Sequence, residues 1–484
     1  MAREIVGRIV SPSGTPVSNA VVLHRSSDQK TLSDDKGIFS LNIPDSYKII
    51  LEIIHSDYMV KIVSLTLETL NKSVLIQLKP YFLQREDITV TAFRYPEASI
   101  SFPAAETVLT RETIETNMHE NVSEGLLELP GVSNIGAGGF SLVPNIRGLA
   151  RRRILILLDN ARVTSERRTG ASASFVNPHD IDRIDVLRSP SSVFYGSDAI
   201  GGIIHILTRK PSLNKRIQGS IQTRYSTINQ GKNIGFNLDG GTDHTGFYLS
   251  FQGIDAENYS SPEGKVLQSF FTQGSMLGKV SHKTDKREIH LSFLGARGQN
   301  IGKANKDSIS KPTWYPKEGH NFIQFQWKEK HLAKDGEIDF QAFLNPQYLE
   351  TKKEKVIPFK KSESFSRTRS LDYGLFFSYR REIVKIRITS GVDVFGRTGV
   401  QAKSITTTYN ESSEILSSSE EWPYRKGMRS DLGFFLSLDY FGLKNLDLVG
   451  GGRLDIIRLK ALPGGSVQFA KSEHKAVTGF IGSS

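Results

Sequence analysis

The sequence of 484 residues contains no cysteine, and this absence excludes several kinds of chemistry. Disulfide bonds, thiolate metal sites and cysteine nucleophiles all need a thiol, and so does a lipid anchor on an N-terminal cysteine. Long hydrophobic runs are also missing. The longest, Ile154 to Leu158, is far shorter than the roughly 18 apolar residues that a membrane helix needs. Any membrane crossing must therefore be made by β-strands.

The charged residues exclude some partners and leave others open. The net charge is +11, but the basic residues are scattered and form no recognisable nucleic-acid-binding module. Nucleic acid is therefore not an expected partner, whereas an anionic membrane surface fits the charge equally well. Histidines such as His24 and His55 occur singly in strand-like runs and give no zinc-site spacing. We expect no catalytic residues, no metal site, no cofactor and no enzyme activity.

The most informative segment, 181–208, joins two short apolar strands through a tight turn and a glycine cluster. Apolar alternation predicts buried strands around Ile184 and Ile204. Between them, Gly201 and Gly202 allow a backbone to pass where any Cβ would clash. A phosphate-binding glycine loop is excluded, because the segment has no Lys-Ser/Thr and leads into a strand instead of a helix. A surface loop is the simpler alternative.

Segment 181–208 resembles the closing signature of the plug domain of TonB-dependent outer-membrane receptors, and segment 145–163 resembles that domain's other signature. The chain departs from the family pattern at Ser189, where glycine is usual, although a serine can hold the extended dihedrals favoured before Pro190. The residues that match the two signatures are Arg147, Gly148, Asp159, Arg183, Arg188, Pro190, Tyr195, Gly196, Gly201 and Gly202.

The resemblance implies a function for the plug arginines. In such receptors, plug arginines lie near the barrel wall and pair with its acidic residues, which implies this role for Arg147 and Arg188. Burial inside a barrel favours pairing, because an unpaired buried charge is costly. A solvated surface arginine is the alternative.

We predict four regions along the chain. Residues 1–80 form a β-sandwich that resembles the carboxypeptidase-regulatory-like module, residues 81–94 a linker, residues 95–210 an α/β plug, and residues 211–484 the first half of a barrel. Within the plug, helices are expected to start at Thr110 and at Asn121. The linker holds a stretch that resembles the TonB box, namely Asp87, Ile88, Thr89, Val90, Thr91 and Ala92. An ordinary linker strand is the alternative.

After Pro211 the pattern changes to amphipathic strands. Apolar and polar residues alternate at 217–225 and 431–440, so that one face meets lipid and the other a polar lumen. Every second connection is a tight turn, as in barrels with short periplasmic turns and long extracellular loops. We expect about twelve strands of about 9 to 11 residues each, with long loops that include 350–365 and 398–428.

About twelve strands are too few to enclose a plug, because only barrels of about 22 strands are wide enough. The predicted fold class is therefore mainly β: an N-terminal β-sandwich, an α/β plug domain and an incomplete transmembrane antiparallel β-barrel. The N-terminus shows no apolar export signal, and the chain ends in a strand-like AVTGFIGSS without the terminal aromatic residue usual in the family. We expect that both ends are cut and that the sheet stays open.

Together these features predict an energised importer in the outer membrane of a Gram-negative-type bacterium. The expected partners are the TonB energy-transducing protein at the periplasmic side, outer-membrane lipid and a bulky small molecule such as an iron chelate, haem or a vitamin. A surface receptor or adhesin that binds without transport is the alternative. We expect residues 160–178 to form an exposed apex where Arg162, Arg167 and Arg168 attract an anionic ligand. The alternative is that these arginines only solvate the loop or pair with Glu166 and barrel acids.

Overall fold

A computed structural model describes most of the chain. The described residues are 2–11, 14–25, 27, 29–44, 48–55, 58–66, 74–78, 106–136, 139–167, 171–188, 195–213, 215–305, 308–332, 336–443, 446–462 and 470–483. The chain divides into two compact units, 1–89 and 90–484. The predicted TonB box lies outside the described residues. Among those described, no helix has the length and apolar character that a membrane span requires.

The first unit is a sandwich of two small sheets. One sheet has the order β4-β1-β7 and the other the order β3-β2-β5-β6. Their inward side chains meet in one core, which contains Ile9 of β1, Phe39 of β4 and Leu51 of β5, each nearly inaccessible to solvent. The strands are β1 (Ala2–Val10), β2 (Val21–His24), β3 (Lys30–Leu32), β4 (Ile38–Pro44), β5 (Lys48–His55), β6 (Tyr58–Thr66) and β7 (Val74–Gln77).

The second unit begins with the predicted α/β plug. Its central sheet has the order β13-β12-β15-β14-β8, and a smaller sheet has the order β11-β10-β9. The helices start where the capping residues predict: Thr110 Oγ1 accepts from the N–H of Thr113 at α2 (Arg111–Asn117), and Asn121 caps α3 (Val122–Leu126). The strands are β8 (Glu106–Thr110), β9 (Val132–Ile135), β10 (Val143–Ile146), β11 (Leu149–Ala150), β12 (Ile154–Leu158), β13 (Ala161–Val163), β14 (Ile181–Leu187) and β15 (Gly202–Thr208).

The rest of the second unit is one antiparallel sheet of twelve strands, in chain order from β16 to β29. In the described residues, β16 and β29 each pair with a single neighbour, so the sheet is open, as predicted. The strands are β16 (Gln218–Ser226), β17 (Gly231–Gly241), β18 (Thr245–Ala256), β21 (Phe271–Lys283), β22 (Arg287–Gly302), β23 (Thr313–Leu332), β24 (Gly336–Ile357), β25 (Lys360–Ile383), β26 (Ile386–Asn410), β27 (Ile415–Leu443), β28 (Leu446–Leu462) and β29 (Ala470–Ser483).

Strands β16 and β17 have the predicted length, with 9 and 11 residues, but many of the later strands are much longer than the sequence predicted. Strands β24 to β27 contain 22, 24, 25 and 29 residues, so the predicted loops 350–365 and 398–428 are largely paired strand. Their polar composition suggested loops, but antiparallel pairing satisfies the backbone of a polar hairpin wherever it lies. The predicted alternation of tight turns and long loops holds only in part. A longer connection, which contains β19 (Ser260–Ser261) and β20 (Gly264–Lys265), joins β18 and β21, but β24 and β25 are joined by two residues, as are β25 and β26.

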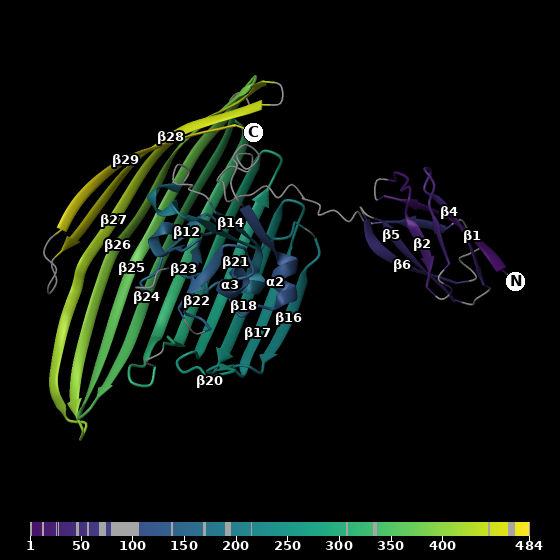
Figure 1. The fold of residues 1–484 in the computed structure, drawn as a ribbon. Coiled ribbons are helices and arrows are strands. Elements are labelled where there is room, and N and C mark those ends of the chain that lie inside the picture. Colours follow the sequence, from purple (N-terminus) through teal and green to yellow (C-terminus); the bar gives the residue numbers. More distant parts are fainter. Residues whose placement is uncertain are drawn as a thin grey trace. The chain divides into compact units, whose positions relative to one another are not determined.

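The plug packs against one face of the long sheet, as Figure 1 shows. A single apolar core contains plug residues such as Ile156 and Phe175 together with sheet residues such as Leu277, Ala296 and Phe322. On β27, the side chains of Asp431, Phe435 and Ser437 are buried on this inner face, and the alternate ones from Phe434 to Tyr440 are exposed, as predicted. The plug therefore covers the face of the sheet that carries its buried charged side chains together with some apolar ones, and the largely apolar face lies outside.

Candidate functional site: the interface between plug and sheet

Arg147 and Gly148 form the tight turn between β10 and β11. Both have positive φ angles, +49° and +81°, which is the requirement of a two-residue hairpin turn. Arg147 Nη1 donates to the carbonyl oxygen of Arg188 at 3.2 Å, and Arg188 Nη2 donates to Thr107 Oγ1 at 2.6 Å. Within the described residues, both arginines thus bond to atoms of the plug. The barrel-pairing role implied for these two arginines is not what the structure shows.

Gly201 and Gly202 lie where backbones pass closely, as predicted. A Cβ on Gly202 would lie 2.3 Å from the carbonyl oxygen of Leu187, and φ there is +133°. A Cβ on Gly201 would lie 2.8 Å from Cβ of Leu149. These contacts are impossible for real side chains, so only glycine allows β15 to start beside β14 and the β11 hairpin.

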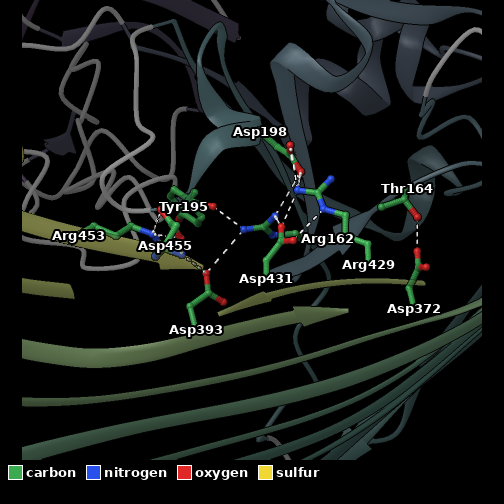
Figure 2. A network of polar contacts seen from close by, with 10 residues as sticks. All are labelled: Arg162, Thr164, Tyr195, Asp198, Asp372, Asp393, Arg429, Asp431, Arg453 and Asp455. Carbon is green, nitrogen blue, oxygen red and sulfur yellow. Dashed lines mark hydrogen bonds and ion pairs between the residues drawn. The ribbon is translucent and has the colours of Figure 1, made fainter. Parts of the chain in front are cut away.

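Arg162 of β13 reaches the sheet through the network drawn in Figure 2. Its guanidinium lies 3.4 Å from Asp198 of the plug, and 3.7 Å and 3.9 Å from Asp393 of β26 and Asp431 of β27. It also donates a hydrogen bond to the carbonyl oxygen of Tyr195. The Arg162 side chain is only 5% exposed, so these carboxylates replace the water that its charge has lost.

Two arginines of the sheet complete this network. Arg429 of β27 lies 3.0 Å from Asp198, and Arg453 of β28 lies 3.2 Å from Asp393 and 2.8 Å from Asp455. A Cβ on Gly196 would lie 3.4 Å from both Arg162 Nη2 and Arg453 Nη2, and φ at Gly196 is +85°. The signature glycine therefore leaves room for two guanidinium groups beside the plug backbone.

Arg167 forms a separate buried pair with Glu318 of β23. Its Nε and Nη2 atoms donate to the two carboxylate oxygens, with an Nε to Oε1 distance of 2.8 Å. Nη1 donates to Ser172 at 3.3 Å, and the guanidinium carbon lies 5.0 Å from the centre of the Tyr315 ring. Both side chains are less than 10% exposed. This is the forked geometry that favours arginine over lysine.

A third contact group surrounds Asp372 of β25, whose side chain is completely buried. Thr164 of the plug donates to this carboxylate. Arg397 of β26 donates to it at 2.8 Å and to Thr164 Oγ1 at 2.7 Å. Arg397 also lies 3.4 Å from Glu166, a plug residue that accepts a hydrogen bond from Ser370 at 2.6 Å. The ion pairs therefore run in both directions: a sheet arginine pairs with the plug residue Glu166, and the plug residue Arg162 pairs with sheet carboxylates.

Asp159, a signature residue, binds on both sides of the interface. It accepts from the N–H of Thr208 at 2.9 Å, within the plug, and pairs with Lys279 of β21 at 2.8 Å. Burial alone would raise the pKa of Asp159, but the Lys279 ammonium group and the hydrogen bonds lower it below its ordinary value. Asp159 is therefore an anion that fixes the plug to the sheet.

Three glutamines of the sheet bind the plug through its main chain. Their Nε2 atoms donate to plug carbonyl oxygens, with distances of 2.7 Å from Gln273 to Phe175, 3.2 Å from Gln324 to Leu158 and 2.8 Å from Gln326 to Asp159. A backbone carbonyl is present whatever the plug side chain is. These contacts therefore hold the plug independently of which side chains it carries at the three positions.

The predicted exposed apex at 160–178 is wrong for most of its described residues. Residues 161–163 and 172–178 are buried, as is Arg167, because the sheet covers them. Arg162 and Arg167 pair with sheet carboxylates, as the alternative interpretation of the sequence predicts, and Arg168 lies outside the described residues. Arg183, another signature residue, lies 3.1 Å from Asp185 within the plug, and Pro190 is not among the described residues.

Several residues of this interface could not be identified from the sequence. Thr164 and Asp198 have no pattern that separates them from surface residues, and the sheet partners are far away in the chain. The sequence does contain a weak signal. Asp372, Asp393 and Asp431 lie at inward positions of three consecutive strands with alternating polar and apolar residues, and a buried carboxylate at such a position needs a cation.

Comparisons with known proteins agree with this architecture. Residues 98–203 match the family described as TonB-dependent Receptor Plug Domain. Over 132 residues, 26% of this chain and 20% of the relative, it is 38% identical to the iron-regulated outer membrane virulence protein of Vibrio cholerae. Over 211 residues, 43% of this chain and 32% of the relative, it is 29% identical to the vitamin B12 transporter BtuB of Vibrio vulnificus.

A solved structure extends the similarity beyond the plug. The copper transporter OprC superposes with a TM-score of 0.63 at 16% identity, covering 78% of this chain and 60% of that one. At this identity the likeness concerns the fold. The matched regions span about a fifth and a third of the length of the two curated relatives.

Proposed function

Because the chain has the plug domain and the fold of TonB-dependent outer-membrane receptors, we propose that it imports a scarce, bulky ligand across the outer membrane with energy supplied through TonB. The observation that carries the proposal is the polar interface between plug and sheet. Arg162, Arg167, Asp159 and Glu166 all pair across it. Ion pairs can exchange their partners for water when the plug moves, whereas a wholly apolar interface would expose surface that water does not solvate.

In this proposal, the stretch Asp87 to Ala92 is the coupling element. Its β-branched alternation suits addition as a strand to the edge of a partner sheet, where main-chain hydrogen bonds supply most of the affinity. It precedes the plug directly in the chain, so that a pull on it is transmitted to β8 and to the plug sheet. The TonB protein is accordingly the proposed partner at the periplasmic side.

The proposed ligand class is an iron chelate, haem or cobalamin. The names of the relatives support an outer-membrane uptake role and differ in cargo: one is iron-regulated, one carries vitamin B12, and the similar structure carries copper. Arg168 remains the predicted ligand contact among the three arginines, because Arg162 and Arg167 already hold sheet carboxylates.

For the N-terminal unit we retain the carboxypeptidase-regulatory-like assignment as a proposal. Its support is the two-sheet sandwich and the turn from Asp34 to Gly37, where Asp34 Oδ1 accepts from the N–H of Lys36 at 2.9 Å and Gly37 has a φ of +74°. The module name does not imply catalysis.

The coupling proposal is tested by replacing one main-chain donor in the TonB box. Val90→Pro removes an N–H that strand addition needs, while Val90→Thr keeps the backbone and the β-branched shape. Cells that produce the receptor are given radiolabelled ferric siderophores, haem, cobalamin and Cu²⁺ in turn. We expect energy-dependent uptake of one ligand, its loss in Val90→Pro, and its retention in Val90→Thr.

Surface binding provides the control. Binding to cells treated with a protonophore should be equal in all three proteins, because the ligand meets the receptor before coupling. Energised uptake that survives Val90→Pro would contradict the coupling role. Binding without uptake in the unaltered receptor would favour a surface receptor or adhesin.

A further inference from the structure

The outer face of the long sheet carries a hollow that faces away from the plug. The hollow has a volume of about 630 Å³ and spans β17, β18, β21, β22 and β23. All five strands have neighbours on both sides, so the hollow does not depend on the open edges of the sheet. Its walls include Ile234, Phe236, Phe251, Met276 and Phe293. Three of these apolar side chains, those of Ile234, Phe236 and Phe251, are exposed to a degree that suits contact with lipid.

The floor of the hollow is made of glycine. Gly253 of β18 pairs with Gly274 of β21, and both alternate with inward residues that face the plug side. A Cβ on Gly253 would meet nothing closer than 3.9 Å, and one on Gly274 nothing closer than 3.8 Å. Neither glycine has a positive φ. Since neither conformation nor close packing requires glycine here, the effect of these residues is open space at the depth of a side chain.

A positively charged end adjoins the apolar hollow. Arg297 of β22 pairs with Gly274 in the same row, and it also lines a second, smaller hollow of about 310 Å³ with Gln299, Lys317 and Tyr348. Both Arg297 and Lys317 are exposed. Within the described residues, neither cation has a carboxylate partner, although such partners are common elsewhere on this sheet. An arginine beside a lipid-facing surface is costly unless an anion meets it.

The two hollows together match an amphiphile. The apolar hollow suits an acyl chain, and the adjoining one places a guanidinium and an ammonium group where a phosphate would lie. Arg297 lies five residues before the end of β22, and Lys317 lies four residues after the start of β23, where a long connection joins the two strands. The two cations therefore lie toward one edge of the sheet and not at mid-strand.

From this geometry we propose a specific lipid site on the outer face of the sheet: a phosphate-bearing acyl lipid lies with one chain over Gly253 and Gly274 and with its phosphate between Arg297 and Lys317. The site requires a membrane location, and it does not require transport. The lipid site also explains why Gly253 and Gly274 occur in strand interiors, where glycine otherwise weakens the strand.

The site is tested with the intact receptor purified in a neutral maltoside detergent. Native mass spectrometry measures the binding of dioleoyl phosphatidic acid, dioleoyl phosphatidylcholine and inorganic phosphate. We expect one saturable site for phosphatidic acid and binding of phosphatidylcholine that is about tenfold weaker, because its choline cation masks the phosphate. Inorganic phosphate should not compete, because it lacks the acyl chain.

Two variants separate the halves of the site. Gly274→Leu fills the apolar hollow, and Arg297→Gln removes the charge; each should weaken phosphatidic acid binding about fivefold or more, while Arg297→Lys should keep most of it. Gly452→Leu is the matched control, because Gly452 also lies in a strand of this sheet and a Cβ there meets nothing closer than 3.7 Å. It should bind like the unaltered receptor.

Thermal unfolding by circular dichroism shows whether each variant is folded. Folded Gly274→Leu and Arg297→Gln receptors that still bind phosphatidic acid at one site with unchanged affinity would overturn the proposal. So would equal affinity for the two lipids, or binding of many copies without saturation, since these are the marks of a lipid shell without a specific site.

Discussion

At the scale of single residues, the interface depends on charges that have lost their water. The pair between Arg167 and Glu318 is bidentate, and both side chains are almost fully buried. Such a pair adds little net stability relative to a good apolar contact, but the loss of one partner leaves the other charge buried without a counter-ion. The arginine is therefore more important for where the plug sits than for how stable the whole protein is.

The first residue-scale prediction concerns Arg167→Ala. The change leaves the Glu318 carboxylate buried without its cation, and we expect a loss of about 3 to 5 kcal/mol in the stability of the plug against the sheet. The double variant Arg167→Ala with Glu318→Gln should recover much of this loss, since the unpaired charge is gone. The measurement is the urea midpoint at which protease first cleaves the plug of the purified receptor.

Arg287→Ala is the control for that experiment, because Arg287 makes a similar forked contact with Glu329 while its side chain is half exposed. Water can replace the arginine there, so the urea midpoint should hardly change. An Arg167→Ala receptor whose plug is cleaved no earlier than that of Arg287→Ala would show that the buried pair does not hold the plug.

At the scale of elements, the plug strands are positioned by glycines that permit close contact. Gly202 combines a positive φ with a backbone contact, because its Cβ would meet the carbonyl oxygen of Leu187. Gly148 combines a positive φ with open space. The two positions therefore separate backbone strain from steric exclusion.

Gly202→Ala should cost several kcal/mol, because the clash adds to a strain of roughly 1 to 3 kcal/mol from the dihedrals. Gly148→Ala should cost only the dihedral part. Folding yield in membranes and the thermal midpoint of the purified receptors measure the difference. Equal effects of the two substitutions would mean that β15 can move away from β14 without loss.

Helix starts and strand faces were the features that the sequence predicted best, because both depend on residues that are close together in the chain. The starts of α2 and α3 follow from capping at Thr110 and Asn121, and the alternating faces of β27 follow from a period of two. The polar ends of the long strands could not be distinguished from loops, because strand ends that extend beyond a membrane and loops have the same hydrophilic composition. Which arginine meets the sheet was also beyond a local pattern: Arg147 is fixed by a turn, and Arg162 by carboxylates more than 200 positions away.

At the scale of the whole molecule, the proposed transport requires the plug to move relative to the sheet. The absence of native cysteine makes this directly testable, because any introduced pair of thiols is unique. Thr164 of the plug donates to Asp372 of the sheet, so their side chains are adjacent, and Figure 2 shows them facing each other.

A receptor with Thr164→Cys and Asp372→Cys should lose energised uptake when mild oxidation joins the two thiols in a disulfide. Ligand binding at the cell surface should persist. Each single-cysteine receptor, treated in the same way, should keep the uptake that it shows without reagent, which separates the crosslink from the substitutions. Full uptake by the crosslinked receptor would mean that the plug does not leave the wall near β25 during transport.

The glutamine contacts of the sheet have a consequence for how such proteins diverge. Gln273, Gln324 and Gln326 bind plug carbonyl oxygens, and every amino acid supplies the same oxygen. Side chains at Leu158, Asp159 and Phe175 can therefore be replaced over many generations without breaking these bonds, provided that the main chain keeps its path. Domains exchanged between distant members of a lineage would keep this part of the attachment and would need to rebuild only the charge pairs.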